Sequence, residues 1–449
     1  MKKKEFLLFR ELARINYKLL LFLALGSLIP LLYSTFRIYW IGQMEDGSAF
    51  NIAAQVTWMS LLYEVLNEAL LLPLAFILGQ VIQEKAVWQQ RIATTLSLFF
   101  IIYLAVTLLF FIYVPDAVSF MQQSPQLYVQ TVQYIRLEAV AILFSSLFSY
   151  FQLVLILKNH RKFLYLLLIL QSVLILILDS ILVSSLSFSL QLGLLGVALC
   201  NIAVSLILAC ISCVALYAQE IRLSQIRLKG NVWIKDYCQK AAISGIESGI
   251  RNIVFVLIIL KMINMAERSG DFWLMNQFIW GWLLLPVFAI AQLVKQDAAV
   301  HQALNPLRIK AYLALMTGVI LLWFCTMPWW ETFIRQVMGI EHAQQITHWV
   351  IGMIGCYTLF AWNSVFDQYF YGIGRIDLIL YQTIAVNGLF YGTVYLLYAM
   401  NLITVSLSSI LLIFGLSLVL DSFVTFMQYL RLRHPQGKTV VENIAIKPL

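Results

Sequence analysis

Ionisable side chains interrupt several long apolar stretches of the chain, and these residues could bind protons, cations or anions. Glu64 and Glu68 are four positions apart, which places them on one face of a helix. Two carboxylates this close in a medium of low polarity cannot both ionise cheaply. The pair could hold a proton or a cation, and Arg37 could neutralise it if the helices pack together. Asp179 and Asp421 lie near predicted helix ends, where we expect them to reach water.

A second charged pair follows in the middle of the chain. Glu247 and Arg251 are also four positions apart and can pair along one helix. Arg37 and Arg251 occupy matching positions of an internal repeat, in the segments STFRI and SGIRN. Arginine stays charged and binds carboxylate or phosphate through two parallel hydrogen bonds, which favours an anionic or amphipathic anionic substrate. In the competing interpretation a glutamate neutralises each arginine, which then does not meet the substrate.

The repeat also contains two prolines. The run LLLP at 70–73 recurs as LLLP at 283–286, so Pro73 and Pro286 take corresponding places in two apolar helices. Proline inside a helix removes a backbone hydrogen bond and kinks it. We predict a shared kink that shapes a central cavity.

The composition indicates that the helices that position these residues are surrounded by lipid. Hydrophobic residues make up 61% of the 449 residues and charged residues only 12%, whereas soluble domains are about 25% charged. A membrane-spanning helix needs about 20 mainly apolar residues, and continuous rather than alternating apolar runs exclude a β-barrel. Twelve segments qualify, at 18–41, 52–82, 92–114, 128–157, 163–185, 193–217, 241–264, 271–294, 309–330, 345–370, 376–399 and 403–429.

The distribution of the 30 lysines and arginines orients these helices. Most of them lie in the N-terminus, the C-terminal tail and alternate loops, which are the cytoplasmic segments if both termini are inside. We therefore predict an all-α, multi-pass protein of a bacterial inner membrane with both termini in the cytoplasm. The basic loop at 219–240 divides it into two pseudo-symmetric six-helix bundles, an N-terminal lobe at 1–218 and a C-terminal lobe with a short cytoplasmic tail at 241–449.

Several functional classes find no support in the sequence. The six cysteines and five histidines are dispersed, so we predict no metal site and no cofactor. The chain has no HExxH or GxSxG motif and no large soluble loop, so we predict that it is not an enzyme. The basic residues form no contiguous domain, which argues against nucleic acid. The expected partners are membrane lipids and a small substrate, and we expect a monomer.

Short motifs along the chain resemble those of one transporter family. They are PLL at 30–32 followed by IG at 41–42, GLLGVA at 193–198, GIE at 245–247 and GIGR at 372–375. Together with twelve helices in two halves, they make the sequence similar to the multidrug and toxin extrusion (MATE) family, within the multidrug/oligosaccharidyl-lipid/polysaccharide exporter superfamily.

The resemblance implies a secondary active transporter. Such an antiporter would export a small organic solute by alternating access, coupled to protons or sodium ions. Counting back from Gly42, Arg37 stands where many members carry an aspartate implicated in coupling, so Glu64 and Glu68 could substitute for it. Glu247 matches an acidic position of the family. Because arginines in both halves are also reminiscent of lipid-linked oligosaccharide flippases, a flippase for an anionic lipid-linked oligosaccharide is the alternative.

Overall fold

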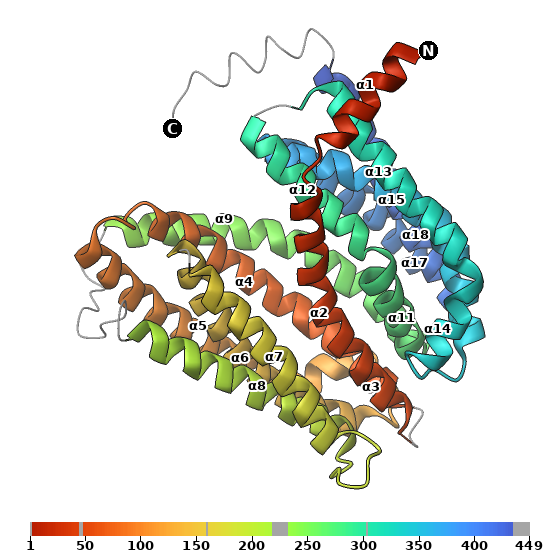
Figure 1. The fold of residues 1–449 in the computed structure, drawn as a ribbon. Coiled ribbons are helices and arrows are strands. Elements are labelled where there is room, and N and C mark those ends of the chain that lie inside the picture. Colours follow the sequence, from red (N-terminus) through yellow and green to blue (C-terminus); the bar gives the residue numbers. More distant parts are fainter. Residues whose placement is uncertain (1, 45–47, 159, 218–231, 302–303, 434–449) are drawn as a thin grey trace. The chain divides into compact units, whose positions relative to one another are not determined.

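The computed structural model describes residues 2–44, 48–158, 160–217, 232–301 and 304–433, and every regular element within these ranges is helical (Figure 1). The first half contains α1 (Lys2–Ala13), α2 (Tyr17–Gly42), α3 (Ala49–Ala53), α4 (Val56–Gly79), α5 (Lys85–Phe120), α6 (Tyr128–Leu157), α7 (Arg161–Leu182) and α8 (Gly193–Tyr217). The second half begins with α9 (Val232–Val254), η2 (Phe255–Leu260), α10 (Lys261–Met265), α11 (Ser269–Asn276), η3 (Gln277–Leu283) and α12 (Leu285–His301). It continues with α13 (Pro306–Thr326), η4 (Met327–Trp329), α14 (Trp330–Gln336), α15 (Ala343–Gly372), α16 (Ile376–Thr383), η5 (Ile384–Phe390), α17 (Tyr391–Ala399) and α18 (Leu407–Arg433).

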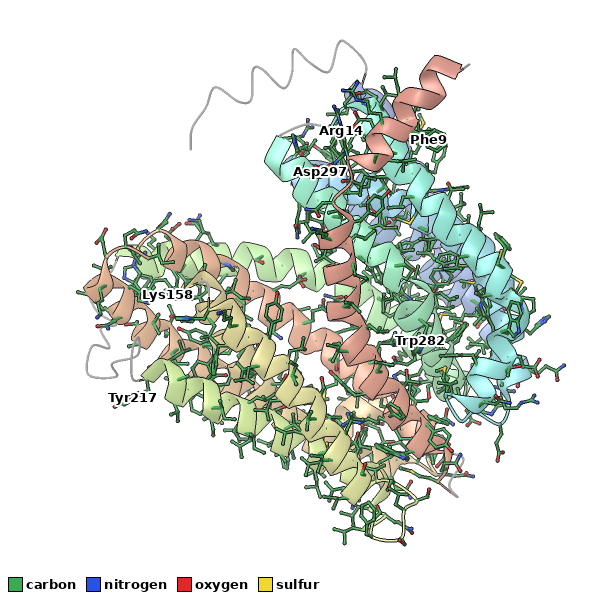
Figure 2. The ribbon with its side chains drawn as sticks, in the orientation of Figure 1. Phe9, Arg14, Lys158, Tyr217, Trp282 and Asp297 are labelled. Carbon is green, nitrogen blue, oxygen red and sulfur yellow. The ribbon has the colours of Figure 1, made fainter. Side chains whose placement is uncertain are left out.

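Helices lie at each of the twelve predicted positions, which confirms the all-α class. Within the described ranges, nine helices are long and apolar enough to cross a membrane, or ten when the bent pair around Leu284 counts as one span. Large apolar side chains project outward from them; Leu108 on α5 is 56% exposed, and Tyr217 at the end of α8 is 60% exposed (Figure 2). Such surfaces are stable against lipid rather than water.

The chain divides into two compact units, whose bounds differ from those of the predicted lobes. Unit 1 comprises Met1–Leu32 and Leu274–Leu449, and unit 2 comprises Tyr33–Trp273. Helix α9 therefore groups with the N-terminal helices. Of the predicted linker at 219–240, residues 219–231 lie outside the described residues, and 232–240 already form the start of α9.

Small residues explain why α9 joins unit 2. A Cβ atom added to Gly245 would lie 3.0 Å from the Cβ atom of Ala69 on α4, so the two helices approach closely. The hydroxyl of Ser244 donates to the carbonyl of Glu68 at 2.9 Å, and that of Tyr237 donates to the carbonyl of Leu70 at 3.1 Å. In the same unit, α6 packs against α5 and α8.

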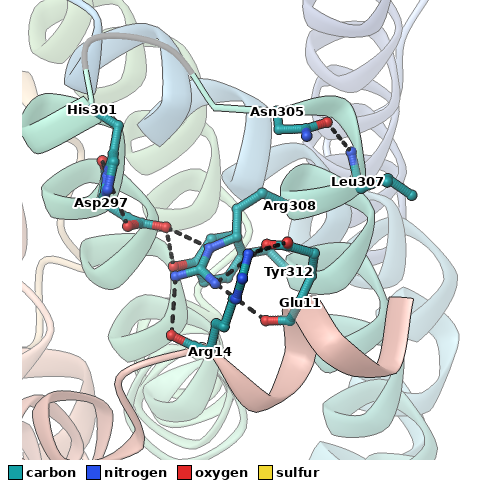
Figure 3. A network of polar contacts seen from close by, with 8 residues as sticks. All are labelled: Glu11, Arg14, Asp297, His301, Asn305, Leu307, Arg308 and Tyr312. Atoms are coloured by element: carbon teal, nitrogen blue, oxygen red, sulfur yellow. Dashed lines mark hydrogen bonds and ion pairs between the residues drawn. The ribbon is translucent and has the colours of Figure 1, made fainter. Parts of the chain in front are cut away.

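Unit 1 is built around α15, which packs against α12, α13 and α18. Helix α1 packs on α13, and Arg308 of α13 joins the two (Figure 3). Its guanidinium donates to the carbonyls of Glu11 and Arg14 at 3.1 and 3.3 Å and to Oδ2 of Asp297 at 2.8 Å. Asp297 also accepts from the hydroxyl of Tyr312 at 2.7 Å. This network fixes the N-terminal segment to unit 1.

The two predicted kink prolines have different surroundings. Pro286 is the second residue of α12 and directly follows a 53° break at Leu284, where η3 ends. Pro73 is buried inside α4, which continues to Gly79 as one α-helix. The π-helical segment η3 precedes Pro286, and such segments are frequent at functional sites.

Candidate functional site

Arg37, on α2, is a largely buried charge of unit 2 with several polar contacts. Its Nε atom donates to Oδ2 of Asp179 at 2.7 Å, and its Nη2 atom donates to Oδ1 of the same carboxylate at 3.1 Å. This two-point geometry is the strongest form of an arginine–carboxylate pair. Asp179, on α7, takes the place that we expected Glu64 or Glu68 to take as the partner of Arg37.

A third helix extends the pair toward a second acid. The Nη1 atom of Arg37 donates to Oδ1 of Asn201 on α8 at 2.7 Å. The amide nitrogen of Asn201 donates in turn to Oε1 of Glu138 on α6 at 2.8 Å. Tyr134, one turn earlier on α6, is also buried. The chain of hydrogen bonds therefore runs from Glu138 through Asn201 and Arg37 to Asp179.

The turn between α7 and α8 positions two members of this network. The backbone amide of Leu192 donates to the carbonyl of Leu182 at 2.8 Å. Gly193, with φ of +60°, then starts α8 in a conformation that favours glycine. A Cβ atom on Gly196 would lie only 2.7 Å from the carbonyl oxygen of Leu182, so only glycine allows α8 to pack this closely on the end of α7.

Burial makes the network electrostatically expensive unless its members stay paired. Asp179 is fully buried, Glu138 is 3% exposed, and the side chain of Arg37 is 17% exposed. Removing one partner of such a pair leaves an uncompensated charge, which costs about 3–5 kcal/mol. Two carboxylates surround one guanidinium, so the site is acidic when both are ionised. Arg37 uses its Nε, Nη1 and Nη2 atoms within the network.

A cavity of about 740 Å³ within unit 2 reaches this network through Tyr134. It lies between the end of α2, the start of α6 and the turn before α8. The described residues of its lining are uncharged, and glutamine and serine side chains line it beside two aromatic rings: Gln43, Gln130, Gln133, Gln191, Ser184, Ser185, Trp40 and Tyr134. Such a mixture of apolar surface and a few hydrogen-bonding groups is typical of small-molecule sites.

The other predicted site residues lie elsewhere. Glu64 is exposed and Glu68 is half-buried on α4. The side chains of Glu247 and Arg251 lie outside the described residues, so their pairing stays a prediction. Within the described part of the chain, no group of three or more histidine, cysteine, aspartate or glutamate residues could hold a metal ion.

Sequence reasoning placed Asp179 in water, and this was wrong. The residue is three positions before the end of α7, but the close approach of α8 covers it. Asn201 gave no signal, because a single asparagine in an apolar helix has no local partner. Glu138 lies inside an apolar run of the sequence, where an acid is expected to meet another helix, and its contact with Asn201 on α8 agrees with this.

Comparisons with known proteins agree with the helical architecture. No protein-family model and no curated protein match the sequence, but solved structures do. The inward-facing form of a multidrug resistance MATE family transporter of the MOP superfamily superposes with a TM-score of 0.69 at 14% identity, covering 93% of this chain and 96% of that one. A MATE transporter from Vibrio cholerae gives 0.64 at 13% identity, covering 96% and 97%.

A third structure differs in its described chemistry. It is a MOP superfamily transporter from Pyrococcus furiosus whose binding pocket has reverse polarity, which suggests a different function for that protein. It gives a TM-score of 0.63 at 17% identity and covers 93% of this chain and 96% of that one. The resemblance inferred from short motifs is thereby confirmed at the level of structure: the chain has the fold of the MATE transporters of the MOP superfamily.

Proposed function

We propose that this chain is a secondary active transporter that exports a small organic solute by cation-coupled alternating access. The MATE fold supports the class, because the solved structures with this fold are transporters. The observation that carries the proposal is the acidic network of Arg37, Asp179, Asn201 and Glu138 beneath a polar, aromatic cavity. Ionised groups in membrane helices usually face a protein interior and mark a transport pathway.

The cavity chemistry favours a neutral or cationic solute. Trp40 and Tyr134 offer ring faces that attract organic cations, and the glutamines offer both donors and acceptors. The network below adds two carboxylates and one guanidinium, so its field attracts positive charge when both acids are ionised. A transported amphipathic cation would therefore find complementary charge and shape at one place.

Glu138 is our candidate for the coupling group. Asp179 is engaged by the guanidinium of Arg37 at two points, whereas Glu138 accepts a hydrogen bond from the neutral amide of Asn201. A proton or sodium ion on Glu138 would remove the excess negative charge of the site. Its release would restore the attraction for a cationic solute, which links solute binding to cation movement in opposite directions.

The alternative, a flippase for an anionic lipid-linked oligosaccharide, has one observation in its favour. A structural neighbour has a binding pocket of reverse polarity, and Arg37 brings a positive charge to this site. However, the guanidinium already donates to Asp179 and Asn201, which reduces its capacity to bind pyrophosphate. We therefore place export of a cationic or neutral solute first, in an inner membrane with both termini in the cytoplasm.

Everted membrane vesicles that contain the full chain would test this proposal. We expect gradient-dependent uptake of a cationic fluorescent dye, and Glu138→Gln should abolish its dependence on an imposed proton or sodium gradient. Glu331→Gln is the matched control, because Glu331 lies in an exposed pair with Arg335 on α14. Uptake of an anionic lipid-linked sugar in place of the dye, or unchanged coupling in Glu138→Gln, would overturn the proposal.

A further inference from the structure

Positive charge gathers at one end of unit 2, where α4 and α6 end and α5, α7 and α9 begin. Figure 2 shows Lys158 at this end. The described acids of these helix ends are Glu84 and Asp236, and Asp236 forms an ion pair with Lys240 at 2.7 Å. The described cations outnumber them: Lys85, Arg91, Lys158, Lys162, Lys235 and Lys240. This end of the unit is therefore positively charged however its acids are paired.

Three of these cations lie within one turn of the buried ring of Trp88, on α5. The Nζ atom of Lys158, which caps the end of α6, is 4.7 Å from the centre of this ring. Lys85 and Arg91 stand one turn before and one turn after Trp88 on the same helix. An aromatic face attracts a cation without neutralising its charge. The ring therefore positions Lys158 and leaves its charge able to attract an anion.

Arg91 has a hydrogen-bond donor to spare. Its guanidinium carbon lies 5.3 Å from the centre of the ring of Trp233 on α9, and its Nη1 atom donates to the carbonyl of Ile77 on α4 at 2.8 Å. Its Nε atom is buried and has no hydrogen-bond partner in the part of the chain that the structure describes. Buried donors are normally matched, and phosphate oxygens are strong acceptors for arginine. This nitrogen is therefore a donor that an anionic ligand can use.

Helix α7 continues the basic end into an apolar surface. Its first turn carries Lys162, which is exposed. Leu166, Ile169 and Val173 follow at spacings typical of one helix face, and all three are exposed. A lysine at the head of an exposed apolar row matches a molecule with an anionic head and a hydrocarbon tail.

We propose that the basic cluster of Lys85, Arg91, Lys158 and Lys162 binds the phosphate of an anionic phospholipid, whose acyl chains lie along the apolar row of α7. Basic pockets between membrane helices on the cytoplasmic side are known to suit phospholipid head groups. The cluster lies in the inner leaflet if both termini are cytoplasmic, as proposed above. The inference does not otherwise depend on the proposed function.

The apolar row favours a lipid over other anions. A free phosphate or a nucleotide would use the cations but would leave Leu166, Ile169 and Val173 uncovered. A zwitterionic phospholipid would cover the row but carries no net charge to balance the cluster. Basic residues at the inner ends of helices are common in membrane proteins, so charge alone defines no site. The ring contact of Lys158 and the spare donor of Arg91 make this end more specific.

Native mass spectrometry of the full chain in a non-ionic detergent would measure the binding of single lipids. The probes are dioleoylphosphatidylglycerol, which is anionic, and dioleoylphosphatidylcholine, which has the same chains and no net charge. Glycerol 3-phosphate supplies a phosphate head without chains. The test variant combines Lys158→Gln and Lys162→Gln. The control variant combines Lys18→Gln and Lys310→Gln, which removes two exposed lysines from unit 1.

We expect the wild type and the control variant to bind phosphatidylglycerol at least about tenfold more tightly than phosphatidylcholine, a difference of 1.4 kcal/mol. The test variant should lose this preference and keep its affinity for phosphatidylcholine. An equal loss in the two variants would overturn the proposal, because it would show attraction to charge in general. Displacement of the lipid by an equal concentration of glycerol 3-phosphate would also overturn it and would assign the cluster to a soluble phosphate compound.

A second variant separates lost binding from lost folding. Lys158→Arg combined with Lys162→Arg keeps both charges, so it should keep the preference for phosphatidylglycerol. Gel filtration and the unfolding midpoint without added lipid check that both double variants fold. A folded arginine variant that lost the preference as completely as the glutamine variant would contradict a site that recognises charge.

Discussion

The buried acids of the two units have different kinds of partner. In unit 2, the guanidinium of Arg37 pairs with Asp179, and the amide of Asn201 links it to Glu138. In unit 1, the described residues that donate to Asp367 on α15 and Asp421 on α18 are the neutral Asn363, Gln382 and Thr425. A buried acid beside an internal cation is stabilised by that pairing, whereas two acids without one repel each other. The comparison therefore predicts opposite changes in stability when one charge is removed from each cluster.

Arg37→Ala should have the largest effect. It leaves Asp179 buried without its counter-charge, so we expect unfolding free energy to fall by about 3–5 kcal/mol. Equilibrium unfolding in mixed micelles measures the change. Arg335→Ala is the control, because its pair with Glu331 is exposed and should contribute about 0–1 kcal/mol. Equal losses in the two variants would show that the network of unit 2 is no more than a surface pair.

Asn201→Leu removes the link between Arg37 and Glu138 without removing a charge. Both groups lose a hydrogen bond in a buried site, so we expect a loss of about 1–3 kcal/mol in the same assay. The double variant with Glu138→Gln should lose less than the sum of the two single changes, because the residues are in contact. If the two losses of stability added strictly, Glu138 would not interact with the network.

Asp367→Asn should change stability in the opposite direction when sodium is absent. It removes one of two like charges that no internal cation balances, so we expect a gain of about 1 kcal/mol in choline buffer. A loss of stability in choline as large as that of Arg37→Ala would erase the contrast between the units.

Tyr134→Phe should have the smallest effect. It removes the hydroxyl of a buried side chain one turn from Glu138 and leaves the ring that lines the cavity, so we expect a loss of about 0.5–1.5 kcal/mol. Dye binding should weaken more when an exposed cavity glutamine such as Gln130 is replaced by alanine in addition. If Tyr134→Phe abolished dye binding alone, the hydroxyl rather than the ring would be the recognition group.

The sequence predicted the helices well because spanning a bilayer demands about 20 apolar residues in a row. It also identified Arg37, because the cost of a buried guanidinium does not depend on knowing its partner. It did not identify Asp179 as that partner, since this acid is buried by the approach of Gly196 to Leu182, a contact between helices that the sequence does not reveal. Asp367 was missed because its partner, Asp421, is far away in the chain and packs beside it only when α15 and α18 meet.

The regular spacing of Glu64 and Glu68 suggested a buried pair that the structure does not contain. Positions four apart do share a helix face, but spacing says nothing about whether that face is buried. In the structure Glu64 is exposed and Glu68 half-buried, whereas Glu138, with no acidic neighbour at helical spacing, is almost fully buried. Burial, which decides whether an acid can act in transport, depends on helix packing.

Whether the solute site attracts positive charge can be measured directly by fluorescence polarisation on the purified full chain. The titration would compare a cationic dye with an anionic dye of the same size at one salt concentration. The acidic network around Arg37 predicts that the cationic dye binds at least about tenfold more tightly, a difference of 1.4 kcal/mol. Tighter binding of the anionic dye would contradict this account and would assign Arg37 to substrate recognition.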